Sequence, residues 1–132
     1  MNLRPEAWLK QAHNDLALAR LAKDNCFMSQ ACYHASQAAE KALKGALLEL
    51  GIEPPHTHVL IELVQRLGNE GLNVTRLEVL PLHGLSRMAI QSRVPVDTTA
   101  PADLFDLADA EQAIQTAEAV LNVVASFDDQ VE

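Results

Sequence analysis

The segment between Ser29 and Gly51 constrains the fold of this chain more than any other part of the sequence. Ser29 is a favourable N-cap residue, and Gly51 suits the position just past a helix end. Between them, residues recur in steps of three and four along two neighbouring stripes, one of Cys32, Ser36, Ala39, Leu43, Ala46 and Leu50, the other of Ala31, Ala35, Ala38, Ala42 and Gly45. This spacing predicts a helix over 29–50 with neighbours on two faces, and the small-residue stripe allows a close approach.

Four further helices are predicted from helical spacing and from residues typical of helix ends. They span 5–23, 57–68, 75–92 and 106–127. Pro5 suits a first helical position, Thr57 is a fair N-cap, and Thr75 with Glu78 has the pattern of a capping box. Pro81 lies inside the fourth helix and predicts a kink or a late start.

The last helix has two candidate caps, Asp103 and Asp106. The stretch from residue 93 to residue 101 is expected to be extended or loop. Five helices joined by short connections predict an all-α, up-and-down bundle. The length predicts one domain over residues 1–132.

Composition agrees with closely packed helices. Hydrophobic residues make up 48% of the 132 residues and aromatic residues 4%, and the apolar content is largely alanine and leucine. A sheet would draw more on β-branched and aromatic residues. No apolar run approaches the ~20 residues that cross a bilayer, and no secretory signal is recognisable. Cys32 falls on a buried stripe and Cys26 in the preceding loop, so a cytoplasmic protein without disulfides or a membrane partner is expected.

The formal charge of -8 is unevenly distributed. All ten Lys and Arg residues lie at or before Arg93, and nine of the 18 acidic residues lie after it. The first three quarters of the chain are therefore close to neutral, and the last quarter is acidic. This pattern does not support a broad nucleic-acid footprint, and no DNA partner is expected. It leaves room for a small cationic site before residue 96.

The predicted second helix resembles the signature of the HEPN domain family. The resemblance begins with the run from Ala35 to Lys44, which reads ASQAAEKALK. It extends over essentially the whole chain through three further groups: Trp8, Ala12, Asp15 and Leu16; Gly51, Pro55, Thr57, His58 and Leu60; and Arg93, Val94 and Pro95.

The resemblance implies a small prokaryotic HEPN-type bundle that forms a homodimer. Such proteins are often encoded beside a minimal nucleotidyltransferase, and many of these pairs are toxin–antitoxin systems. In those, the HEPN subunit is a metal-independent endoribonuclease whose signature is an Arg followed, after four to six residues, by a His. Here no His follows His83, so the signature cannot be carried over to Arg93.

The function expected is therefore that of a HEPN subunit of a two-component nucleotidyltransferase–HEPN system, of toxin–antitoxin type. It would act by protein interaction and by binding nucleotide or RNA. One alternative is an active endoribonuclease with a non-standard site around Arg93. Another is a nucleotide-binding accessory subunit of the transferase. No cofactor is expected for any of the three.

Five residues are candidates for the site. Arg93 could stabilise a phosphorane, and His58 could act as a base or make a structural hydrogen bond to the loop or a neighbouring helix. Lys41 and Lys44 could form an anion cradle, or lie on a solvated face where Glu40 pairs with Lys44. The fifth candidate for ligand binding is Arg87. His56 with His58 is too small a set to predict a metal site.

Overall fold

The computed structural model describes residues 4–92 and 99–128, and every regular element in these ranges is a helix. The helices are α1 (Pro5–Asp24), α2 (Met28–Glu49), α3 (Leu60–Asn69), α4 (Thr75–Glu78), α5 (Leu82–Gln91), α6 (Pro101–Leu104) and α7 (Leu107–Ser126). The five helices of ten residues or more confirm the predicted all-α bundle. Arg93 lies outside the described residues.

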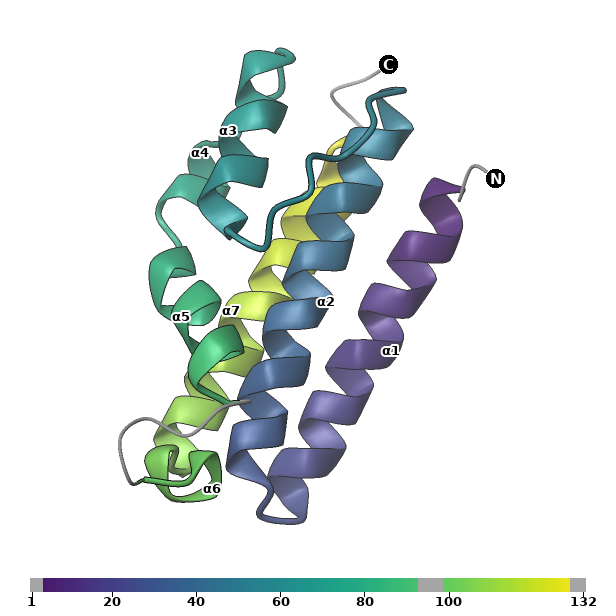
Figure 1. The fold of residues 1–132 in the computed structure, drawn as a ribbon. Helices are drawn as coiled ribbons and strands as arrows, with labels where there is room; N and C mark the ends of the chain where they lie inside the picture. Colours follow the sequence, from purple (N-terminus) through teal and green to yellow (C-terminus); the bar gives the residue numbers. More distant parts are fainter. Residues whose placement is uncertain (1–3, 93–98, 129–132) are drawn as a thin grey trace.

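Helix α2 occupies the centre of the bundle, with α1 on one side, α3 and α5 on the other, and α7 behind it, where it contacts both α2 and α1 (Figure 1). The small-residue stripe is the face that meets α1. A Cβ atom added to Gly45 would lie 3.2 Å from the Cβ atom of Trp8 and 3.5 Å from the carbonyl oxygen of Pro5. Even a methyl group at this position would make a tighter contact with Trp8 than most Cβ atoms make, so the predicted close approach is confirmed.

Three helices end in the same way, with one residue in the left-handed region. Gly51 (φ 79°) follows α2, Gly71 (φ 99°) follows α3, and Cys26 (φ 66°) follows α1. In each case the next residue donates its N–H to a carbonyl in the last turn; for Ile52 the acceptor is Leu47, at 3.0 Å. This is the Schellman arrangement, so the end predicted at Gly51 is confirmed.

Two predicted helix starts are wrong. Helix α2 begins at Met28, with Phe27 as its N-cap. Ser29, the predicted N-cap, is the second residue of the helix and is buried. Helix α3 begins at Leu60 rather than at Thr57, whose hydroxyl accepts a hydrogen bond from the N–H of Val59 at 3.1 Å. Neither N-cap residue, Phe27 or Val59, makes a side-chain capping hydrogen bond, so the local capping preferences of Ser29 and Thr57 do not set these two starts.

The predicted fourth helix is split into α4 and α5. Pro81 is the N-cap of α5, so the break predicted at this residue is a complete interruption. The Thr75 capping box is wrong, because Val74 is the N-cap of α4 and the side chain of Asn73 accepts from the N–H of Thr75 at 3.1 Å. The short helix α6 was not predicted.

The observed start of α7 agrees with the start predicted from the sequence. Asp106 is its N-cap, and its carboxylate accepts from the N–H of Asp109 at 2.9 Å. In return, the Asp109 carboxylate accepts from the N–H of Asp106 at 3.0 Å. One of the two predicted caps is thereby confirmed, in a reciprocal capping box.

The core contains mostly leucine, alanine and valine, and Leu43 is fully buried at its centre on α2. Leu43→Ala should lower the free energy of unfolding by about 2–5 kcal/mol, because it leaves a cavity in a close-packed region. Denaturant titration measures this. The control is Ile90→Ala on α5, where the side chain is exposed and the change should stay within about 0.5 kcal/mol. Equal losses in both variants would contradict this placement of the core.

Candidate functional site

The carboxylate of Glu40, on α2, is contacted by two basic side chains, and the three residues form a small cluster. Its side chain is 8% exposed, and its carboxylate lies 3.1 Å from the ammonium group of Lys44, which is 11% exposed. The Nδ1 atom of His58, in the loop between α2 and α3, lies 3.0 Å from the same carboxylate. The predicted pair between Glu40 and Lys44 is confirmed, but it does not lie on a solvated face. We call Glu40, Lys44 and His58 the Glu40 cluster.

A second ion pair joins α2 to α1. The ammonium group of Lys41 lies 2.6 Å from a carboxylate oxygen of Asp15, whose side chain is 7% exposed. The side-chain amide of Gln11 donates to the other oxygen at 2.9 Å. This contact was not predicted from the sequence, although a signal was present. Asp15 stands beside Leu16 on the buried stripe of α1, where an acidic residue requires a partner.

The two lysines offered as an anion cradle are thus both neutralised within the chain. Each ammonium group has a carboxylate at hydrogen-bond distance, and both carboxylates are buried. A buried carboxylate is costly to leave unpaired, so these pairs are not readily exchanged for an external phosphate. The geometry therefore assigns Lys41 and Lys44 a structural role first. An anion can reach them only at their exposed edges.

His58 has a defined hydrogen-bonding geometry and an open edge. When the imidazole is neutral, Nδ1–H donates to Glu40, which leaves Nε2 as the proton acceptor. The side chain is 77% exposed, so Nε2 can meet water or a solute. The predicted hydrogen bond to a neighbouring helix is confirmed. The hydrogen bond between His58 and Glu40 holds the loop against α2. Two residues after His58, the N–H of Leu60 donates to the hydroxyl of Ser86 on α5 at 3.1 Å.

The remaining candidate cations do not join this cluster in the described structure. Arg87 is exposed on α5, a different element from those that carry Glu40, Lys44 and His58. Arg93 is outside the described residues. In the ranges 4–92 and 99–128, no group of three His, Cys, Asp or Glu side chains is arranged to hold a metal ion. The same ranges contain no helix with the length and apolar character that crossing a membrane requires.

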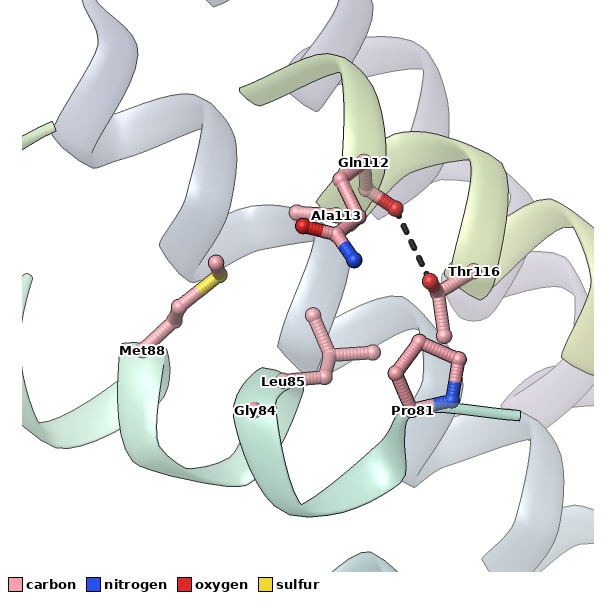
Figure 2. A pocket seen from close by; sticks show the side chains of 7 residues that line it. All are labelled: Pro81, Gly84, Leu85, Met88, Gln112, Ala113 and Thr116. Carbon is pink, nitrogen blue, oxygen red and sulfur yellow. Dashed lines mark hydrogen bonds between the residues drawn. The ribbon is translucent and has the colours of Figure 1, made fainter. Parts of the chain in front are cut away.

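Two pockets bear on ligand binding. One, of about 270 Å³, lies beside the ion pair with Asp15 and is lined by Ala7, Trp8, Gln11 and Lys41. The other, about 40 Å³, lies between α5 and α7 and has room for little more than one water molecule (Figure 2). Its Thr116 hydroxyl already donates to the backbone carbonyl of Gln112 at 2.9 Å. The first pocket is therefore the better place for a ligand.

The thiol groups differ sharply in character. Cys32 is buried, as predicted, and burial with the nearby carboxylates of Asp109 and Asp106 raises its pKa to about 12. It stays a neutral thiol at any physiological pH and is a poor nucleophile. Cys26 is exposed in the turn between α1 and α2.

Loss of Glu40 should be costly, because it leaves the ammonium group of Lys44 buried without a counter-charge. Glu40→Ala is expected to lower the free energy of unfolding by about 3–5 kcal/mol in chemical denaturation. Glu70→Ala is the control. It removes another pair spaced by four residues, with Arg66 at 3.3 Å, whose side chains are 48% and 37% exposed. There the loss should be below about 1 kcal/mol. A loss at Glu40 no larger than at Glu70 would rule out a structural role for the cluster.

Comparisons with known proteins agree with this architecture. The model of the HEPN domain family matches residues 5–127. The protein TT1696 from Thermus thermophilus is 30% identical, with a TM-score of 0.86, and the match covers 96% of this chain and 98% of that one. An archaeal HEPN homologue, ST0689, is 29% identical, with a TM-score of 0.72 and coverage of 95% and 98%. No curated protein matches the chain. The family match spans nearly all of the sequence, and the chain belongs to the HEPN domain family.

Proposed function

We propose that this chain is the HEPN subunit of a two-component nucleotidyltransferase–HEPN system of toxin–antitoxin type. It acts as a homodimer, through protein contacts and through binding of nucleotide or RNA. The transferase is its partner, and rapid RNA cleavage is not its task.

The observation that supports a role in protein contacts is the apolar surface at one end of the bundle. Leu21 and Phe27 are each 59% exposed and Leu18 is 39% exposed, and these three side chains line one groove beside the turn between α1 and α2. Large apolar side chains gathered on one region of a surface mark places where proteins associate. A two-component system requires such surfaces both for the homodimer and for the transferase.

A nucleotide-binding accessory role is the second candidate, and the pocket beside Lys41 favours it. Its lining includes the indole of Trp8, on which a base can stack, beside the ammonium group of Lys41 and the amide of Gln11, both of which are bonded to Asp15. The volume of about 270 Å³ suits part of a nucleotide, such as a base. Ligand binding and transferase binding are compatible roles for one subunit.

Complex formation with a transferase is the direct test of the proposed function. The reading frame adjacent to this gene should encode a minimal nucleotidyltransferase, and its product, co-expressed with this chain, should elute with it as one species. Light scattering on the eluted peak measures the stoichiometry. In the control, the same transferase is mixed with this chain after the chain has been unfolded, and no complex should form. A nucleotidyltransferase neighbour that never associates with the folded chain would overturn the proposal.

Ribonuclease activity is expected to be weak or absent. Arg93 can stabilise negative charge on a phosphorane but cannot remove a 2′-OH proton, since its guanidinium stays protonated. General acid–base catalysis typically contributes about 10²–10⁴-fold, so its loss slows cleavage by that order. His58 is the available base, and within the described ranges its side-chain partner is Glu40 rather than an arginine. RNA incubated with the parent protein and with the Arg93→Ala and His58→Ala variants should be degraded equally slowly. Fast cleavage that either substitution abolishes would establish the endoribonuclease alternative.

A further inference from the structure

The pocket beside Lys41 lies where α1 and α2 meet and is almost entirely apolar. Ala7, Trp8 and Gln11 share one face of α1, and Lys41 on α2 completes the lining. Its volume is about 270 Å³. Sites that enclose a drug-sized ligand measure about 300–1,000 Å³, so this pocket has room for a ring system and leaves the rest of a nucleotide outside.

The part of the Trp8 side chain that a ligand can reach is carbon. The residue is partly exposed, whereas its Nε1 atom is buried and has no hydrogen-bond partner among the residues that the structure describes. The ring is therefore held by packing, and the Cβ atom of Trp8 lies 3.2 Å from the position that a Cβ atom at Gly45 would take. An indole fixed in this way offers a surface on which another aromatic ring packs.

The two polar side chains of the pocket are occupied by Asp15. The ammonium group of Lys41 lies 2.6 Å from one carboxylate oxygen, and the amide of Gln11 donates to the other at 2.9 Å. The Asp15 side chain is 7% exposed, so withdrawing its ammonium partner would leave a buried charge uncompensated. Because Asp15 balances the charge of Lys41, the pocket offers a phosphate no net positive charge.

The arginine closest to the pocket in sequence does not change this balance. Arg4 is the N-cap of α1, one helical turn before Trp8, and it is exposed. A phosphate that met Arg4 would do so in solvent, where ion pairs contribute little and salt screens them. Glu6, in the first turn of the same helix, is also exposed and carries the opposite charge.

We infer that the pocket beside Lys41 holds one unpaired nucleobase by aromatic contact with Trp8 and leaves the sugar and phosphates in solvent. The base belongs either to a free nucleotide or to an unpaired position of RNA. Base–aromatic stacking tolerates any base, because every base has a π-face. The site should therefore favour the larger purine rings and not distinguish bases by their edges. This inference rests on the proposed binding of nucleotide or RNA and specifies which part of that ligand the chain contacts.

The first experiment compares ligands that carry the base, the phosphate or both. The chain has a single tryptophan, so its fluorescence reports from the pocket itself. Adenosine should quench it, ATP should bind within about fivefold of adenosine, and ribose 5-phosphate should not bind. Inosine, which differs from adenosine at its edge, should bind as adenosine does, and uridine more weakly. Free N-acetyltryptophanamide with the same ligands corrects for absorption and collisional quenching.

The second experiment blocks the pocket while keeping the reporter. Ala7→Leu should weaken adenosine binding about tenfold or more, because the larger side chain takes the space of the base. Ala17→Leu is the matched control, since Ala17 is exposed on the same helix and lies outside the pocket. It should leave binding unchanged.

Circular dichroism checks the fold of both variants. If Ala7→Leu fails to fold, equilibrium dialysis with labelled adenosine is applied to two substitutions of Trp8. Trp8→Leu should weaken binding about tenfold or more, and Trp8→Phe should retain part of it, because it keeps an aromatic ring. Equal binding by the parent and Trp8→Leu would overturn the assignment of the pocket.

The outcomes separate this site from the proposed function. If no nucleoside, nucleotide or RNA binds, the inference fails together with the nucleotide-binding part of the proposal. If adenosine binds the parent and Ala7→Leu equally, this pocket is overturned and ligand binding elsewhere on the chain stands. If ATP binds far more tightly than adenosine and salt abolishes the difference, the phosphates are recognised and the base-only site is overturned.

Two RNA probes identify the source of the base. Hexaadenylate presents unpaired bases, whereas a blunt RNA duplex keeps its bases stacked and should not compete with adenosine. Binding of hexaadenylate that matches adenosine per base indicates a free nucleotide, and tighter binding per base indicates RNA; both results support the site. Competition by the duplex as strong as that by the single strand would contradict it.

Discussion

The close contact between α1 and α2 is the constraint on which the rest of the structure depends. It is possible because α2 presents a stripe of alanines ending in Gly45, and a Cβ atom at Gly45 would lie 3.2 Å from that of Trp8. Helices this near leave no room for long side chains between them. Polar groups near the seam must therefore be paired directly. Asp15, buried on α1, meets Lys41 of α2 at 2.6 Å, and Gln11 completes its hydrogen bonding.

A neighbouring face of α2 has a similar arrangement around Glu40. One buried carboxylate there serves both Lys44 on its own helix and His58 on the loop that leads to α3. The loop is thus attached to the central helix by the hydrogen bond between His58 and Glu40 as well as by backbone hydrogen bonds at Gly51. For function, the consequence is that the cations of α2 are used to hold helices and loop together. The positive charge that a nuclease site would need is not available from them.

The surface left for partners lies mainly at one end of the bundle. There the chain turns from α1 into α2 through Cys26, in a backbone conformation usually given to glycine, and presents Phe27 to solvent. Helix α6 and the start of α7 lie at the same end of the bundle (Figure 1), and Leu104 and Leu107, which belong to them, are exposed. Rigid backbone and exposed apolar side chains in one region are the properties of a binding surface, and they fit a subunit that works by association.

The sequence by itself determined the helical class, the central helix with its two stripes, the ends at Gly51 and Asp106 and the membership of the HEPN family. These follow from short-range periodicity, from residues with strong conformational preferences and from a motif that is contiguous in the chain. Only the tertiary structure decided that Asp15 pairs with Lys41, that α2 begins at Met28 and that Leu18, Leu21 and Phe27 share a groove. Those features depend on which faces of separate helices meet. That choice rests on packing between residues distant in sequence, which short-range patterns such as the capping tendencies of Ser29 and Thr57 do not contain.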